Sequence, residues 1–145
     1  MYRGIVLLVL ALMLGLPGST SAQAPAKDGR QGVALSEPTL VYVLTEMRNL
    51  MEAIQGVMEA TGKSDWAKAS AAADKSGMKA AGATPKEVTA ELPQEIRQMS
   101  RQMRLAFDAV AETATKGEAT AINAKLSEVM NFCNACHQTY RFTQK

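Results

Sequence analysis

The chain has 145 residues with a formal net charge of +2, and 47% of its residues are hydrophobic and 21% charged. This length and balance suit one folded globular domain rather than a disordered chain, and the near-neutral charge gives no electrostatic reason to expect a nucleic-acid partner. Its 2 cysteines and 1 histidine exclude a disulfide-rich scaffold and every metal or catalytic site that needs two histidines.

The first residues have the organisation of a secretory signal peptide. Arg3 supplies a positive charge and precedes an apolar run over residues 5–16. That run is shorter than the roughly 20 residues of a membrane-spanning helix. Small residues predict cleavage after Ala22, with Ala24 as the alternative. We therefore expect residues 1–22 to be a signal peptide and the cleaved chain to have no membrane partner; an uncleaved anchor is the alternative.

A long amphipathic helix is predicted after the N-terminal segment. Residues 23–35 mix proline, glycine and charge without a period, which predicts a flexible N-terminal tail. Ser36 and Pro38 suit the cap and first turn of a helix. Apolar residues then recur every three or four positions until the helix is expected to end near Gly62.

The middle of the chain is less strongly patterned. Asp65 is a candidate cap for a second, alanine-rich helix over residues 66–76. Small side chains allow close helix packing but bury little area each. Residues 77–84 are expected to form a loop, and Pro85 to open a short turn before the next helix.

Two further helices complete the predicted fold. Pro93 suits the first turn of a third helix, which Gly117 ends, and a fourth helix is expected over residues 118–142. No window shows the alternation of a strand beside turn signals. Four helices joined by short loops predict an all-α, antiparallel up-down-up-down four-helix bundle over residues 36–145.

The fourth helix carries the motif CxxCH as Cys133, Cys136 and His137. This motif is typical of covalent haem attachment: two thiols add across the haem vinyl groups and the imidazole is the proximal iron ligand. At positions i, i+3 and i+4 of a helix the three side chains face the same way. The sequence therefore predicts one haem c, with iron, covalently attached to the C-terminal helix.

Other functions for these residues are weighed beside haem attachment. A structural zinc site needs four ligands, and only three candidates occur here. A thioredoxin-like motif belongs at a helix N-terminus beside strands. A disulfide three residues apart on a helix would strain the turn. A methionine cluster could bind Cu(I), but that function leaves the CxxCH motif unexplained.

The motif and its continuation over residues 138–141 resemble the class II cytochromes c, which are cytochrome c′ and its low-spin relatives. The resemblance implies a cytochrome c′-like haem domain over residues 36–145, exported to the bacterial periplasm. It also implies redox partner proteins there, and a homodimer through the first two helices. Such proteins carry electrons or bind gases and are not enzymes in the ordinary sense.

The distal side of the haem decides between these two functions. In the resembling family the first helix carries the distal residue, commonly leucine in gas-binding proteins and methionine in low-spin carriers. Residues 48–54 are similar to the low-spin pattern, which implies Met51 as the distal ligand, with Met47 or Met58 as alternatives. Met/His ligation suits electron transfer. The alternative function is binding of nitric oxide or carbon monoxide at a vacant distal site.

Two arginines are candidate haem contacts. Arg141 lies one helical turn beyond His137, where the resembling family often has a basic residue, although a favourable charge at a helix C-terminus explains it equally well. Arg48 could contact a haem propionate, and a solvated position is the alternative.

Overall fold

The computed structural model describes residues 27–145. The predicted signal peptide, its cleavage site and residues 23–26 lie outside the described residues. Within the described part of the chain, no helix combines the length and the apolar character needed to cross a membrane.

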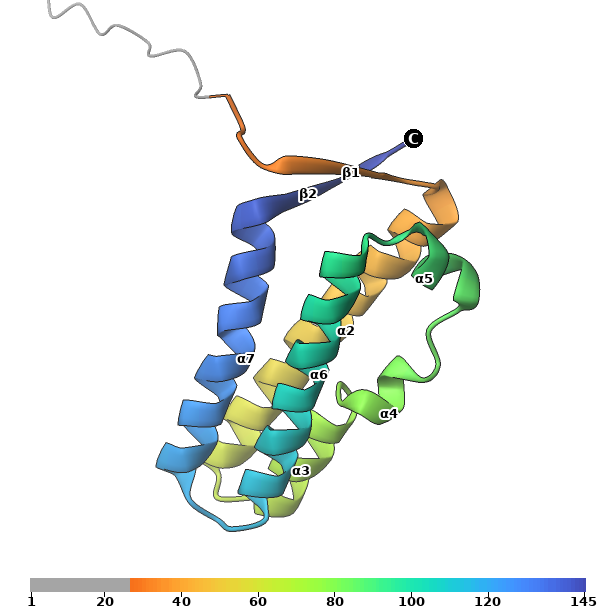
Figure 1. The fold of residues 1–145 in the computed structure, drawn as a ribbon. Helices are drawn as coiled ribbons and strands as arrows, with labels where there is room; N and C mark the ends of the chain where they lie inside the picture. Colours follow the sequence, from red (N-terminus) through yellow and green to blue (C-terminus); the bar gives the residue numbers. More distant parts are fainter. Residues whose placement is uncertain (1–26) are drawn as a thin grey trace, which may run out of the picture.

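Four helices form the body of the fold: α2 (Glu37–Gly62), α3 (Trp66–Asp74), α6 (Gln94–Ala114) and α7 (Ala119–Thr139). Each runs opposite to the one before it, and α3 packs on both α2 and α6 while α7 packs on α6 (Figure 1). The predicted all-α up-down-up-down four-helix bundle is confirmed.

The first two bundle helices begin at the predicted cap residues, but only Asp65 caps its helix as predicted, and the prediction for Ser36 is wrong. Ser36 precedes α2 with Pro38 in its first turn, but its hydroxyl does not cap the helix main chain. It donates instead to Glu91 Oε1 at 2.6 Å, and the Ser36 N–H donates to Glu91 Oε2 at 2.8 Å. Asp65 caps α3 by accepting a hydrogen bond from the Lys68 N–H at 3.1 Å.

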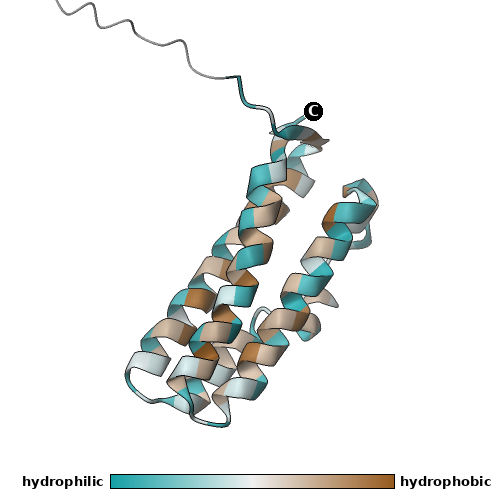
Figure 2. Cartoon of the chain, turned by 60° about the vertical axis from the view of Figure 1, so that its left-hand side comes forward, coloured by the Kyte–Doolittle hydropathy of each residue, from teal (hydrophilic) through white to brown (hydrophobic). Residues whose placement is uncertain are grey.

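The main core lies between α2, α3, α6 and α7. Its largest fully buried side chains are those of Phe107, Ile122, Val57, Val110 and Val129. Hydrophobic and hydrophilic residues alternate along every helix, as expected of amphipathic helices around a common core (Figure 2).

The connection between α3 and α6 contains two short helices. The predicted loop over residues 77–84 includes α4 (Met78–Ala81), and the predicted turn after Pro85 continues as α5 (Lys86–Glu91). Both follow the outer side of the bundle (Figure 1). Because α3 is only 9 residues long, it covers one end of α2 and α6 and leaves the other end to this connection.

A two-stranded parallel sheet corrects two expectations. β1 (Gln31–Leu35) pairs with β2 (Tyr140–Gln144), in a register that runs from Gln31 opposite Tyr140 to Leu35 opposite Gln144. The expectation of a flexible tail is wrong for residues 31–35. The fourth helix ends at Thr139 and not at residue 142, and the expected absence of strands is also wrong.

Burial explains why these segments are ordered. Val33 and Leu35 are buried against Ile96 of α6, with Tyr140 and Phe142 packed beside them. This small second core stabilises the strand pairing. The sequence of either strand alone does not predict it, because the residues of the core come from distant parts of the chain.

Candidate functional site

A cavity of about 290 Å³ lies between α2, α6 and α7. Residues of α5 and β2 and of the connection before α6 complete its walls, and no residue of α3 lines it. The shortness of α3 therefore leaves room for the cavity at the end of the bundle where α7 carries the CxxCH motif. Its volume is near the lower end of the roughly 300–1,000 Å³ typical of ligand pockets.

The CxxCH residues all line this cavity. Cys133, Cys136 and His137 lie in the last turns of α7, where spacings of three and four place them on one face. Both thiols are free and half-buried. Burial raises the pKa of Cys133, and burial together with the charge of Cys133 raises the pKa of Cys136. The structure thus brings together the three residues that the sequence predicts as a unit.

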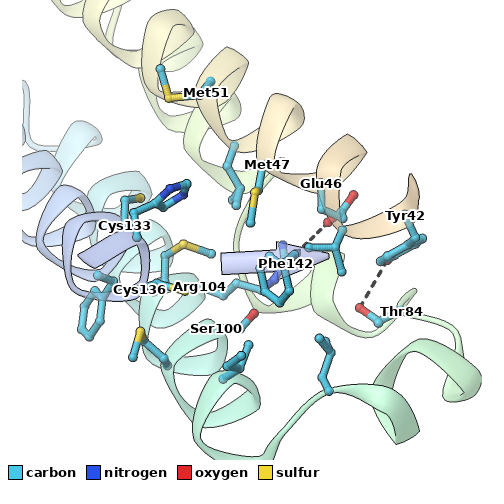
Figure 3. Close-up of a pocket in the computed structure, with 18 of the residues that line it drawn as sticks. Tyr42, Glu46, Met47, Met51, Thr84, Ser100, Arg104, Cys133, Cys136 and Phe142 are labelled. Atoms are coloured by element: carbon cyan, nitrogen blue, oxygen red, sulfur yellow. Dashed lines mark hydrogen bonds and ion pairs between the residues drawn. The ribbon is translucent and has the colours of Figure 1, made fainter. Parts of the chain in front are cut away.

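Methionines face these residues from α2. Met47 and Met51 both line the cavity, one turn apart and across from Cys133 and Cys136 (Figure 3). Met47 is half-buried, whereas the Met51 side chain is 60% exposed. Met58 is 59% exposed and is not among the lining residues, so the structure does not bring this alternative ligand to the site.

Neither predicted arginine lines the cavity. Arg48 is exposed and donates a hydrogen bond to Thr45 Oγ1 at 3.0 Å. Arg141 lies in β2, where its Nε is 3.9 Å from Asp28 Oδ2. Because side chains alternate along a strand, Phe142 lines the cavity in place of its neighbour Arg141.

One arginine that sequence reasoning missed does line the cavity. Arg104 of α6 has a side chain only 6% exposed, and its Nη2 lies 2.7 Å from Glu46 Oε2 of α2. Its Nη1 donates a hydrogen bond to the Ser76 carbonyl oxygen at 3.2 Å. The available signal was helical spacing, since residue 104 falls three positions before Phe107 on the buried face of α6.

The donors around the cavity fit a haem group. Apolar side chains dominate the walls, and thiols, an imidazole and thioethers are the groups that attach and ligate haem iron in c-type cytochromes. The thiols and the imidazole come from α7, while thioethers come from α2 and also from Met99 and Met103 of α6. This donor set is soft and suits iron in a porphyrin better than a hard cation such as magnesium.

A family comparison agrees with this chemistry. Residues 86–141, which span α5 to the first residues of β2, match the family model Cytochrome C′. Over this range the chain is similar to the cytochrome c′ family of class II cytochromes c. The match supports a c-type cytochrome, and that family carries covalently bound haem c with an iron centre. Comparison with curated proteins and with solved structures gives no significant match.

The matched range includes the CxxCH motif but not α2. The match thus covers the residues of α7 that would hold the haem, whereas the methionines of α2 lie outside it.

Proposed function

We propose that the protein is a periplasmic monohaem cytochrome that transfers electrons, with haem held by Cys133, Cys136 and His137 and the iron also bound by Met51. The observation that carries this proposal is the placement of two thiols and an imidazole on one wall of an apolar cavity and of thioethers on the opposite wall. Bound haem c supplies a one-electron couple at its iron.

Each residue has a distinct role in the proposal. Cys133 and Cys136 would hold the group to α7 through thioether bonds, and His137, the next residue, would ligate its iron. A methionine ligand from α2 would raise the reduction potential and leave no place for an added ligand, which suits electron transfer.

Met51 is preferred over Met47 because residues 48–54 are similar to the pattern of the low-spin relatives. Met47 remains the alternative, since it lies one turn earlier on α2 and lines the same cavity. Met58 is disfavoured by its position outside the lining residues.

Gas binding is the second candidate function. The apolar character of the α2 wall beside Met51 favours it. The neighbouring α2 residues that line the cavity, Leu50 and Ile54, are apolar. With Met51 away from the iron, these residues would leave a distal side suited to nitric oxide or carbon monoxide.

The location and partners are part of the same proposal. The signal peptide pattern over residues 1–22 supports export, and members of this family are typically periplasmic. Redox proteins of that compartment are the expected partners; no nucleic-acid or membrane partner is expected. A homodimer through α2 and α3 is supported by the exposed apolar side chains of Val41, Leu44 and Met58 on α2.

The absorption spectrum of the protein matured with haem tests the function. We expect sharp, split bands in the reduced form that carbon monoxide leaves unchanged. Met51→Leu should give a broad high-spin spectrum that shifts with carbon monoxide. Met58→Leu is the matched control, since the two methionines are 60% and 59% exposed but only Met51 lines the cavity.

Two outcomes would contradict parts of the proposal. A wild-type spectrum that is already high-spin and shifts with carbon monoxide would favour gas binding. If Met47→Leu becomes high-spin and Met51→Leu does not, the iron ligand is Met47, one turn earlier on α2. Attachment is tested separately: Cys133→Ser and Cys136→Ser should each lower the yield of covalently bound haem, measured by mass spectrometry of the denatured chain.

A further inference from the structure

A largely buried ion pair in the cavity wall joins two helices. Glu46 of α2 and Arg104 of α6 both line the cavity, and the dashed line between them in Figure 3 joins atoms 2.7 Å apart. Their side chains are 26% and 6% exposed. Removing charges from water is costly unless they are paired, so each charge here depends on the other.

The pair is isolated from other formal charges of the cavity. Among the described residues that line it, Glu46 and Arg104 are the only aspartate, glutamate, lysine or arginine, and the remaining wall is mostly apolar. Coulomb interactions are stronger and less screened in such surroundings than at an exposed surface. A change of charge inside the cavity must therefore interact with both members of the pair.

We propose that Glu46 offsets the effect of the buried Arg104 cation on the reduction potential of the haem iron, and that Arg104 offsets the effect of Glu46 in the same way. This inference rests on the proposed haem site. On reduction the iron takes up one electron from a donor protein, which adds one negative charge to the cavity. Arg104 alone would favour that reduced state, and Glu46 alone would favour the oxidised state. Together they nearly cancel.

Opposite shifts are the measurable consequence. Glu46→Gln leaves an unbalanced cation and should favour reduction on the order of tenfold, which is about 59 mV for a one-electron couple. Arg104→Met leaves an unbalanced anion and should favour oxidation by a similar factor. The double variant should return close to the wild-type potential, and Arg104→Lys should stay close to it because the charge is retained.

Loosened packing would not produce this pattern. A packing defect does not depend on whether the removed charge is positive or negative, so it would not shift the potential in opposite directions in the two variants. Glu59→Gln is the control: it breaks the exposed α2 ion pair with Lys63, away from the cavity, and should leave the potential unchanged. Potentials are measured by spectroscopic titration of the haem-loaded protein, with the spectrum recorded for each variant.

The inference is overturned if Glu46→Gln and Arg104→Met shift the potential in the same direction, or if Glu46→Gln leaves it unchanged. If Arg104→Met does not fold, Glu46→Gln still decides the sign of the shift, with Arg104→Lys as the charge-conserving control that should leave the potential unchanged. Its failure is distinguishable from that of the proposed function. A high-spin, carbon monoxide-sensitive wild type with opposite shifts would sink only the electron-carrier function, whereas a low-spin wild type without them would sink only this inference.

Discussion

Arg30 Nη1 donates a hydrogen bond to the main-chain carbonyl oxygen of His137 at 3.3 Å. The last carbonyls of a helix have no partner within it, so this contact satisfies one of them at the CxxCH motif. Asp28 holds the guanidinium in place, with its Oδ2 2.8 Å from Arg30 Nη2. These hydrogen bonds lower the pKa of Asp28 to about 2. The segment before β1 thus stabilises the end of the helix that carries the proposed haem ligand.

Arg30→Gln should loosen the end of α7 without unfolding the protein. The hydrogen bond to His137 is lost, so main-chain amides of residues 140–142 should exchange with solvent faster. The midpoint of urea unfolding should change little, because exposed ion pairs contribute little to global stability. Amide hydrogen exchange measures the first effect residue by residue, and urea denaturation measures the second. Lys86→Gln, an exposed change in α5, is the control and should leave exchange in β2 as it is; equal exchange in the two variants would count against the contact.

Glu91→Gln should weaken the acid sensitivity of folding. Hydrogen bonds from the Ser36 hydroxyl and N–H, with Lys145 nearby, lower the pKa of Glu91 from 4.5 to about 2. As the pH falls from about 4.5 towards 2, the unfolded chain binds this proton before the folded one, so the wild type loses stability in that window.

The variant lacks this titration, so the loss of stability between pH 4.5 and 2 should be smaller than in the wild type. Urea unfolding at a series of pH values measures it. Ser36→Ala removes only the hydroxyl donor and should produce part of the same effect. Identical pH slopes for wild type and Glu91→Gln would show that this contact does not form.

Phe107→Ala should cost the most stability among single core changes of this kind. Phe107 is fully buried at the centre of the main core, so truncation removes apolar contacts and leaves a cavity. A loss of about 3–5 kcal/mol in the free energy of unfolding is expected from urea denaturation. Leu105→Ala, two positions away and 39% exposed, should cost much less. Similar losses for both variants would contradict the assignment of the core.

Gly117→Ala should destabilise the turn between α6 and α7. Gly117 has φ +75°, a region that costs other residues about 1–2 kcal/mol. An added Cβ would also lie 3.2 Å from Trp66 Nε1. The matched change Gly62→Ala, where a Cβ would have no neighbour within 4 Å, should be neutral or stabilising. Thermal unfolding compares the two, and a more stable Gly117→Ala protein would contradict the turn geometry.

Three bundle helices, α2, α6 and α7, could be predicted from the sequence because each carries its own periodic apolar face. The face of α6 from Ile96 to Phe107 is an example, since every residue of the pattern lies within one helix. The second helix, α3, was predicted from its cap Asp65 and its alanine-rich sequence. The strands lacked such a local pattern. Leu35 is buried only because Ile96 and Phe142 come to it from distant parts of the chain. Local periodicity therefore predicted a fourth helix that continues past Thr139, where the structure instead has β2.

The residues of the site likewise include some that local spacing predicts and some that it does not. Cys133, Cys136 and His137 were predictable because their spacing alone defines one helix face. Arg104 was overlooked because its pairing with Glu46 joins two helices that are far apart in the sequence. The choice of Met51 depends on the resemblance of α2 to low-spin relatives, and it stays a prediction until the spectrum of Met51→Leu is measured.

The parallel sheet also fixes the distance between the end of α7 and the start of α2. β2 begins where α7 ends, β1 leads into α2, and both run from the end of α7 towards the start of α2 (Figure 1). Five residues of strand extend about 16 Å, so the ladder acts as a spacer between the two helices that carry the proposed ligands. Main-chain hydrogen bonds of the ladder thereby hold Phe142 of β2 in the cavity wall. Shortening β1 by two residues should bring the two helices closer together and slow haem loading, even with every ligand residue in place.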